Sequence, residues 1–271
     1  MSFAPGHISL TFAIHDHVDP LKMGSTGVGI VLPQGVYCSI VNENLKGNDN
    51  VVIIENQPVE DPVVLRAIEL LGYGDRGLSI YLRRDLPIGA GFGISGASAL
   101  AACLELDKNL DNCTLASHQA EIEYKTGLGD VVAISSAIEE GNFPLIVNRK
   151  TPGALSVTNT YTVDSKLVVC VSGLGRNTSE IITNSEWFEI INTVSSNLKI
   201  TNYDIRSVIK AGRIFTEKSG LVNENLAEMF DSIPLGAVST VAHLGTSVIA
   251  VSDNTSELSD CLEKYGKILI Y

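Results

Sequence analysis

A closely spaced set of four glycines constrains the fold of this chain more than any other segment. Gly89, Gly91, Gly93 and Gly96 lie between an apolar stretch that predicts a strand and an alanine-rich stretch that predicts a helix. Glycine adopts positive φ angles readily and lets backbone N–H groups approach a ligand closely, and the start of a helix adds unpaired N–H donors and a positive dipole end. Residues 86–101 therefore predict a phosphate-binding loop, with a strand-to-helix connection that binds nothing as the alternative.

The charge of the chain limits what kind of partner it binds. Nineteen Lys and Arg residues stand against 31 Asp and Glu residues, a formal net charge of −12. Such a surface repels nucleic acid at long range, and no basic stripe offsets the repulsion. We therefore expect no nucleic-acid partner, and we expect any phosphate to be bound locally, by backbone amides, a helix end or a metal.

Other features of the composition indicate a globular protein of the cytoplasm. No apolar run reaches the roughly 18 residues that a membrane span requires, and the N-terminus lacks the basic stretch of a signal peptide. The five cysteines are scattered, odd in number and never spaced as CxxC. This usage predicts reduced thiols, with neither a disulfide framework nor a zinc site of paired cysteines.

The first part of the chain predicts strands followed by helices. Apolar and alternating runs separated by turn-forming residues, among them residues 33–35, predict the strands, and apolar residues at helical spacing predict the helices. The strands are expected at residues 8–14, 28–32, 36–41, 51–54 and 78–82, and the helices at residues 62–71, 95–106, 114–126 and 131–139.

A second block of alternating strands and helices begins after Pro144. Its strands are expected at residues 145–147, 155–157, 167–171, 248–251 and 267–270, and its helices at residues 179–184, 187–195, 205–218, 221–232 and 256–265. A chain of 271 residues lies near the upper limit for a single core. We therefore expect an α+β protein with two lobes, residues 1–150 and residues 151–271.

Three common motifs come close to the glycine-rich segment, and each fails on its context. The glycines spell GxGxxG, but the acidic strand end of a dinucleotide-binding unit is missing about 20 residues on, where residues 107–112 form a polar turn. A Walker loop would need a lysine where this chain has alanine. Ser95, Asp130 and His243 follow the chain order of a hydrolase triad, but the serine lacks the GxSxG frame and the parallel strand series around it.

The longer pattern P-x-G-A-G-x-G-x-S-x-A at residues 87–97 resembles the second motif of the GHMP kinase superfamily, whose phosphate loop needs no Walker lysine. The sequence Ala-Pro-Gly at residues 4–6 resembles the N-terminal motif of these kinases. Residues 236–240 lack the usual glycine run of the third motif, which leaves the role of the second lobe less defined. The resemblance implies a two-lobed GHMP kinase fold, with an N-terminal lobe like ribosomal protein S5 and a ferredoxin-like C-terminal lobe.

Details of the motifs resemble one branch of the superfamily, the archaeal pantoate kinases. The phrases PGHI at residues 5–8 and TGLGDVVA at residues 126–133 carry this resemblance, together with Ala-x-Leu-Gly at residues 242–245. It implies ATP-dependent phosphorylation of the 4-hydroxyl of (R)-pantoate in coenzyme A biosynthesis, with ATP and Mg²⁺ as cofactors, by a cytoplasmic homodimer. The alternatives are another small-alcohol kinase, acting on mevalonate or homoserine, and a catalytically silent binding protein of the same fold.

The same resemblance assigns roles to individual residues. It implies that Ser95 and Glu121 hold the metal and that Asp130 accepts the proton of the attacking hydroxyl. Each has a structural alternative: a helix cap for Ser95 and Asp130, a surface carboxylate for Glu121, and Ser98 as a competing metal ligand. The residues expected to bind ATP are Pro87, Gly89, Ala90, Gly91, Phe92, Gly93, Ile94, Ser95, Gly96, Ala97 and Ser98.

Pantoate is an anion, so its site needs a cation and polar donors. A guanidinium can hold a carboxylate with two parallel hydrogen bonds, and a histidine three residues before Glu121 shares its helix face. The structural alternatives are an exposed arginine at a strand end and a half-buried helix histidine. The residues expected to bind the substrate are His7, which takes the place of the lysine of mevalonate kinases, Ser25, His118, Arg149 and Thr178.

Overall fold

One long strand organises the first part of the protein. In the computed structural model, which describes residues 1–42, 49–172, 181, 183–222 and 224–271, strand β3 (Gly24–Asn42) has antiparallel partners on both sides. These partners are β1 (Ser2–Ser9), β2 (Ala13–His15), β6 (Leu78–Arg84) and β7 (Leu145–Arg149). The strands β4 (Val51–Ile54), β5 (Gln57–Val59) and β8 (Thr158–Thr162) complete an eight-stranded sheet. Six of its strands follow the order β5-β4-β6-β3-β7-β8, and β1 and β2 pair with β3 outside this path.

The turn expected at residues 33–35 is wrong, because β3 runs through it. Gly35 pairs with Pro5 and Val31 pairs with His7, so residues 32–34 of β3 lie opposite the single residue Gly6 of β1 and form a bulge inside β3. A Cβ on Gly35 would lie 2.1 Å from the carbonyl oxygen of Ala4, so the glycine serves a close strand approach rather than a turn. The bulge directly precedes the position of His7.

The strand expected at residues 155–157 is also wrong, since the strand begins at Thr158. The backbone N–H of Val157 donates to Thr151 Oγ1, and Lys150 N–H donates to the Val157 carbonyl, which ties this segment into a loop. The following strand β8 pairs with β7 and so belongs to the first sheet. We therefore propose that the division between the lobes lies after Thr162, rather than at residue 150.

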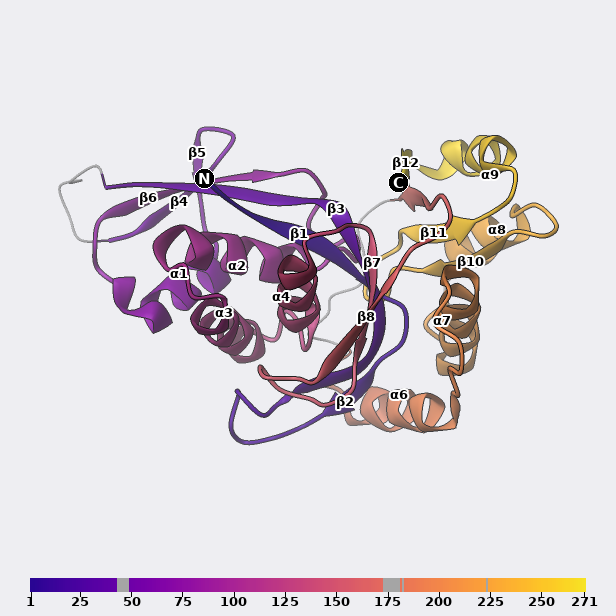
Figure 1. The fold of residues 1–271 in the computed structure, drawn as a ribbon, viewed down its shortest axis with the longest axis horizontal. Helices are drawn as coiled ribbons and strands as arrows, with labels where there is room; N and C mark the ends of the chain where they lie inside the picture. Colours follow the sequence, from indigo (N-terminus) through magenta and orange to yellow (C-terminus); the bar gives the residue numbers. More distant parts are fainter. Residues whose placement is uncertain (43–48, 173–180, 182, 223) are drawn as a thin grey trace.

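Four helices cover one face of the first sheet (Figure 1). They are α1 (Pro62–Ile68), α2 (Ile94–Leu106), α3 (Leu110–Tyr124) and α4 (Asp130–Glu140). A π-helical turn, Glu69–Tyr73, extends α1. The positive φ of Gly72 interrupts the helical backbone there, close to the expected helix end. The alanine-rich face of α2 is buried in the main hydrophobic core, so small side chains let this helix pack closely on the sheet.

The second lobe has its own antiparallel sheet of order β10-β11-β9-β12 (Figure 1). Its strands are β9 (Val168–Val171), β10 (Val238–Val241), β11 (Val248–Val251) and β12 (Lys267–Ile270). Its helices are α6 (Ser185–Asn197), α7 (Ile205–Ser219), α8 (Glu224–Asp231) and α9 (Thr255–Leu262). Along the chain, these elements run as a strand, helices, two strands, a helix and a final strand. Together with the strand order in the sheet, this succession is the ferredoxin-like topology that was expected.

Strand β10 was not expected, because Ser239 and Thr240 interrupt its apolar pattern, although both are buried. Most of the helix expected at residues 179–184 lies outside the described residues.

One hydrophobic cluster extends across both lobes. Leu167, Ile209 and Ala242 of the second lobe belong to the same buried cluster as the α2 side chains of the first. The Tyr271 hydroxyl donates to Gln34 Oε1 at 2.7 Å, which joins the last residue to the bulge of β3. None of the described helices is both long and apolar enough to cross a membrane.

Candidate active site

The glycine-rich segment forms the loop between β6 and α2 that its composition predicted. Gly89, Gly91 and Gly93 have φ angles of 79°, 92° and 60°, in the region that favours glycine. A Cβ on Gly91 would lie 2.6 Å from the carbonyl oxygen of Ala242, and one on Gly245 would lie 2.2 Å from the carbonyl carbon of Ala90. Residues 242–245 of the second lobe therefore pack directly against the phosphate loop.

Two helices begin at this site without a side-chain cap. Gly93 precedes α2 and Gly129 precedes α4, and neither can offer a side-chain acceptor to the first-turn N–H groups. The other α-helices with a described N-cap are capped by side chains: α1, α3, α6, α7 and α9 by Asp61, Asn109, Asn184, Asp204 and Asn254. The first turns of α2 and α4 thus keep N–H donors available for an anion.

Asp130 is the first residue of α4 and contacts both the phosphate loop and β1. Its Oδ1 lies 2.7 Å from Nδ1 of His7, and a Cβ on Gly93 would lie 3.0 Å from the same carboxylate oxygen. Burial by itself would raise the pKa of Asp130, but the hydrogen bond and the electrostatic interaction with His7, followed by the charge of Arg149, outweigh burial and hold this pKa below its ordinary value. The carboxylate is therefore ionised and able to accept a proton.

His7 lies behind Asp130. Its side chain is 0% exposed, whereas that of Asp130 is 21% exposed. The ring therefore contacts Asp130 from inside the protein, and a direct contact between His7 and the substrate stays a prediction.

Glu121 is a buried carboxylate on α3 beside the start of α2. Its side chain accepts a hydrogen bond from Thr126 Oγ1 at 3.1 Å, and Ser95 also bonds to it. Burial, followed by the negative charge of Asp130, raises the pKa of Glu121 to about 8. A cation binds favourably beside a buried acid that has a second carboxylate nearby. Because Glu121 is buried, its interpretation as a solvated surface residue is wrong.

Ser95 and Glu121 have the chemistry of a Mg²⁺ site. Both offer oxygen ligands, which this hard cation prefers, and Mg²⁺ commonly completes its shell with water and substrate phosphates. In the described parts of the chain, no group of three or more His, Cys, Asp or Glu side chains could hold a metal alone. The competing ligand Ser98 is already engaged, because it donates to the Ile94 carbonyl and accepts from Arg84 Nε.

Arg149 carries the most informative unsatisfied groups of the site. It ends β7, its side chain is buried, and Nη1 donates to the Gly129 carbonyl at 2.9 Å. Its Nε and Nη2 have no hydrogen-bond partner among the residues that the structure describes. Since buried donors without a hydrogen-bond partner are costly, these two nitrogens of the guanidinium favour an anionic ligand that accepts from both. The alternative of an exposed arginine at a strand end is wrong.

Ser25 lies beside Arg149. A Cβ on Gly129 would come within 2.5 Å of Ser25 Oγ and 2.9 Å of Arg149 Cζ, so both side chains pack on this glycine, one residue before Asp130. The glycines of the sequence Gly-Leu-Gly-Asp thus make room for the charged residues around them.

The other residues expected to bind substrate are placed differently. His118 is buried, and its Nε2 donates to the Met23 carbonyl at 2.9 Å, in the segment that precedes β3. This nitrogen therefore bonds to the backbone and not to Glu121. Thr178 lies outside the described residues. His243 is packed against Phe12 and Phe215, with ring centroids 5.8 and 5.0 Å away, and hydrogen bonds to Thr216, which removes the basis for a hydrolase triad.

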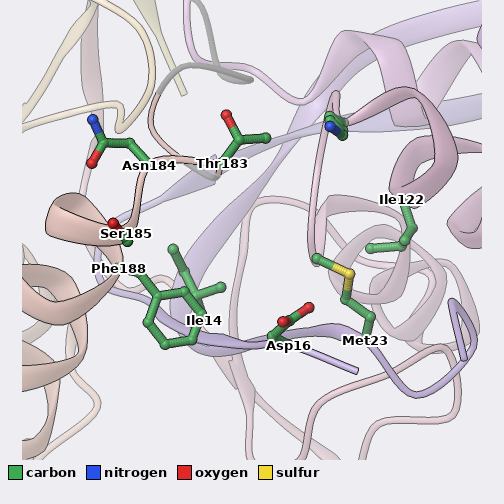
Figure 2. A pocket seen from close by; sticks show the side chains of 9 residues that line it. Ile14, Asp16, Met23, Ile122, Thr183, Asn184, Ser185 and Phe188 are labelled. Carbon is green, nitrogen blue, oxygen red and sulfur yellow. The ribbon is translucent and has the colours of Figure 1, made fainter. Parts of the chain in front are cut away.

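A cavity of about 580 Å³ adjoins these residues and is lined by both lobes. Figure 2 shows Met23 and Ile122 on one side, facing Asn184, Ser185 and Phe188 on the other. Ile122 follows Glu121 in the chain, and the Met23 carbonyl is the partner of His118. The cavity therefore borders the segments that carry Glu121 and His118.

Comparison with known proteins assigns this arrangement to a family. Residues 62–137 match the family model for the GHMP kinases N terminal domain. The pantoate kinase of Methanocaldococcus jannaschii is 31% identical over 270 residues, which cover 96% of this chain and 95% of that protein. The chain belongs to the pantoate kinase family. A further member, the pantoate kinase of Thermococcus kodakarensis, is 28% identical over 100% of this chain and 95% of that protein.

Solved structures confirm the two-lobed fold expected for a pantoate kinase family member. A phosphotransferase related to the CoA biosynthesis pathway aligns with a TM-score of 0.76 at 24% identity, covering 100% of this chain and 97% of that one. Mevalonate kinase from L. major, in complex with R-mevalonate, aligns with a TM-score of 0.61 at 15% identity, covering 100% and 94%. The resemblance found from the motifs is therefore confirmed for the fold and the family.

Proposed function

We propose that this protein transfers the terminal phosphoryl group of ATP to the 4-hydroxyl of (R)-pantoate, as a step of coenzyme A biosynthesis. The observation that carries the proposal is the buried guanidinium of Arg149, with two unpaired nitrogens beside the ionised Asp130. A carboxylate on the acceptor would satisfy Nε and Nη2 together. The pantoate kinase relatives, at up to 31% identity over nearly the full chain, favour pantoate as that acceptor.

The phosphate loop and the uncapped start of α2 supply backbone donors for the phosphates of ATP. Ser95 and Glu121 would hold Mg²⁺, which neutralises charge on the phosphates when it is bound. Phosphoryl transfer requires mainly positioning and charge neutralisation, so the protein needs little covalent chemistry.

The acceptor is positioned from the other side. Arg149 binds its carboxylate, Ser25 is placed to bond the same end, and Asp130 takes the proton of the 4-hydroxyl as the oxygen attacks. His118 and Thr178 stay proposed substrate residues, of which His118 would have to leave its bond to the Met23 carbonyl.

Two other functions fit part of this site: phosphorylation of another small alcohol, and binding without catalysis. Mevalonate and homoserine also carry a carboxylate, so Arg149 alone does not separate these acceptors from pantoate. The altered third motif would suit a catalytically silent protein of this fold. However, residues 242–245 pack against the phosphate loop without a glycine run, and both Glu121 and Asp130 lie at the site.

The test is a coupled ADP-release assay with pantoate, mevalonate, homoserine and pantothenate as acceptors. We expect kcat/KM for pantoate to exceed that for the others by roughly 100-fold or more, because a site that bonds specific polar groups rejects analogues without them. A phosphorus NMR spectrum of the product would place the phosphate on the 4-hydroxyl. Preference for another acceptor, or release of ADP with none, would contradict the proposal. The homodimer and the cytoplasmic location stay predictions.

A further inference from the structure

His7 is fixed on three sides within the first lobe. Its backbone N–H donates to the carbonyl of Phe92 in the phosphate loop at 2.9 Å. Its imidazole lies on Gly29 of β3, where a Cβ would come within 2.0 Å of Nε2. Its Nδ1 lies 2.7 Å from Asp130 Oδ1. The ring therefore has one available orientation, and that orientation points at Asp130.

The contacts of His7 also define its protonation. An ionised Asp130 accepts hydrogen bonds only, so the hydrogen between the two side chains sits on Nδ1. Burial, together with the positive charge of Arg149, lowers the pKa of His7 despite the neighbouring carboxylate. Nε2 has no partner in the described structure, so a second proton there would be a buried donor with nothing to bond. His7 is neutral, with its proton on Nδ1.

A neutral donor differs from a cation in what it does to a base. A full positive charge at this distance would stabilise the carboxylate strongly and weaken it as a proton acceptor. A neutral N–H fixes the orientation of the carboxylate at a smaller cost in basicity. The positive charge of the site then remains with Arg149, whose free nitrogens suit the acceptor.

We propose that His7 is a positioning residue for phosphoryl transfer: its neutral imidazole holds Oδ1 of Asp130 through Nδ1–H, which leaves Oδ2 to accept the hydroxyl proton. The proton moves from the acceptor oxygen to Oδ2 as the new P–O bond forms and the bond to the leaving ADP breaks, and His7 keeps its own proton throughout. This role rests on the proposed function of Asp130 as the base.

Two variants separate a hydrogen-bond role from a packing role. In His7→Asn the amide nitrogen takes the place of Nδ1, whereas His7→Leu has a similar size and no donor. We expect His7→Leu to lower kcat by roughly 10- to 100-fold, with KM for ATP and pantoate within about threefold of wild type, and His7→Asn to recover most of the loss. Equal losses in both variants, or a rise in KM with unchanged kcat, would overturn the proposal.

An NMR measurement tests the same idea without turnover. In the nitrogen spectrum of the wild-type protein, the His7 ring, assigned by its disappearance in His7→Asn, should show a protonated Nδ1 and an unprotonated Nε2. A proton on Nε2, with or without one on Nδ1, would overturn the proposal. Failure of the proposed function would instead appear as wild-type protein that phosphorylates no pantoate while this ring signature persists.

Discussion

Gly127 lies against the carboxylate of Glu121: a Cβ at position 127 would come within 2.3 Å of Oε2. Gly96 approaches the same oxygen from α2, where a Cβ would come within 2.6 Å. The acid thus fills a space that two glycines leave open, between the start of α2 and the loop that follows α3. Any side chain at either glycine must displace the proposed metal ligand.

This relationship predicts a metal phenotype for Gly127→Ala. The added methyl group should move the Glu121 carboxylate and raise the Mg²⁺ concentration for half-maximal activity by roughly tenfold or more, because one oxygen ligand is misplaced. Activity against Mg²⁺ at saturating ATP and pantoate measures it. Gly74→Ala is the control, since Gly74 has an ordinary φ of −61° and meets a flexible Glu69 side chain at 3.1 Å. Unchanged Mg²⁺ dependence in a folded Gly127→Ala protein would argue against Glu121 as the ligand.

The phosphate loop should be tested at Gly89. A Cβ there meets no atom within 4 Å, so Gly89→Ala adds strain at positive φ, about 1–2 kcal/mol, without a clash. We expect the loop to shift and KM for ATP to rise roughly tenfold or more, with KM for pantoate changed less than about threefold. An unchanged KM for ATP in this variant would remove the loop from the ATP site.

Gly91→Val is a harsher change to the same loop. The valine side chain would collide with the backbone of Ala242, because even a Cβ at position 91 would lie 2.6 Å from the Ala242 carbonyl oxygen. We expect it to lower the melting temperature as well as ATP affinity, so circular dichroism must accompany its kinetics.

The proposed base predicts the effect of Asp130→Asn. An amide cannot accept the hydroxyl proton, so kcat should fall by roughly 10²- to 10⁴-fold while ATP and pantoate still bind. Single-turnover kinetics and calorimetric binding of both ligands measure the two parts. A variant that keeps more than about a tenth of wild-type kcat would show that the reaction depends mainly on positioning.

Local patterns predicted much of the fold. Helices α2, α3 and α4 begin within about four residues of their expected starts, because alanine-rich or amphipathic runs and turn residues act locally. The errors have non-local causes. The bulge in β3 is defined only by its pairing with β1, and β10 contains buried hydroxyl-bearing residues whose burial its own sequence does not reveal.

The candidate site divides in the same way. The motif resemblance pointed to Ser95, Glu121 and Asp130, which the fold brings together from the phosphate loop and the segments around α3 and α4. It could not show that His7 faces Asp130, because this contact joins residues 123 positions apart. Thr126 was missed as a partner of Glu121, although the glycines that follow it in the sequence marked a closely packed segment.

Stability should depend on pH through His243. Burial lowers the pKa of His243 to about 4 from its ordinary 6.5. Between these values the unfolded chain binds a proton that the folded state does not, so the free energy of unfolding falls as pH drops from 6.5 toward 4, by at most about 1.4 kcal/mol per pH unit. Above pH 6.5 this contribution is fully present.

Chemical denaturation of wild type and His243→Gln from pH 8 to 4 measures this effect. The difference in their free energies of unfolding should be constant above about pH 7 and should change in favour of the variant below it. The other buried histidines titrate in both proteins and cancel. Parallel curves over the whole range would contradict the assignment.

Substrate selection should depend on Arg149. In Arg149→Ala the acceptor carboxylate loses two charge-assisted bonds in a buried site, a loss on the order of 2–4 kcal/mol. KM for pantoate should therefore rise about 30- to 1000-fold, while KM for ATP moves less than about threefold. Arg149→Lys should recover part of the loss, because an ammonium group cannot reproduce the two parallel bonds. Steady-state kinetics with each substrate varied in turn measures the split.

Arg83→Ala is the matched control, since Arg83 is an exposed arginine on strand β6, which β3 separates from β7, and pairs with Asp85 at 2.7 Å. It should leave both KM values near wild type. The guanidinium of Arg149 also bonds the Gly129 carbonyl, so its removal could loosen the start of α4 and affect both substrates. Equal rises in KM for ATP and pantoate, or no rise in either, would therefore show that Arg149 is structural and that another cation binds the carboxylate. Lys22, on the segment that leads into β3, is the next candidate for that cation.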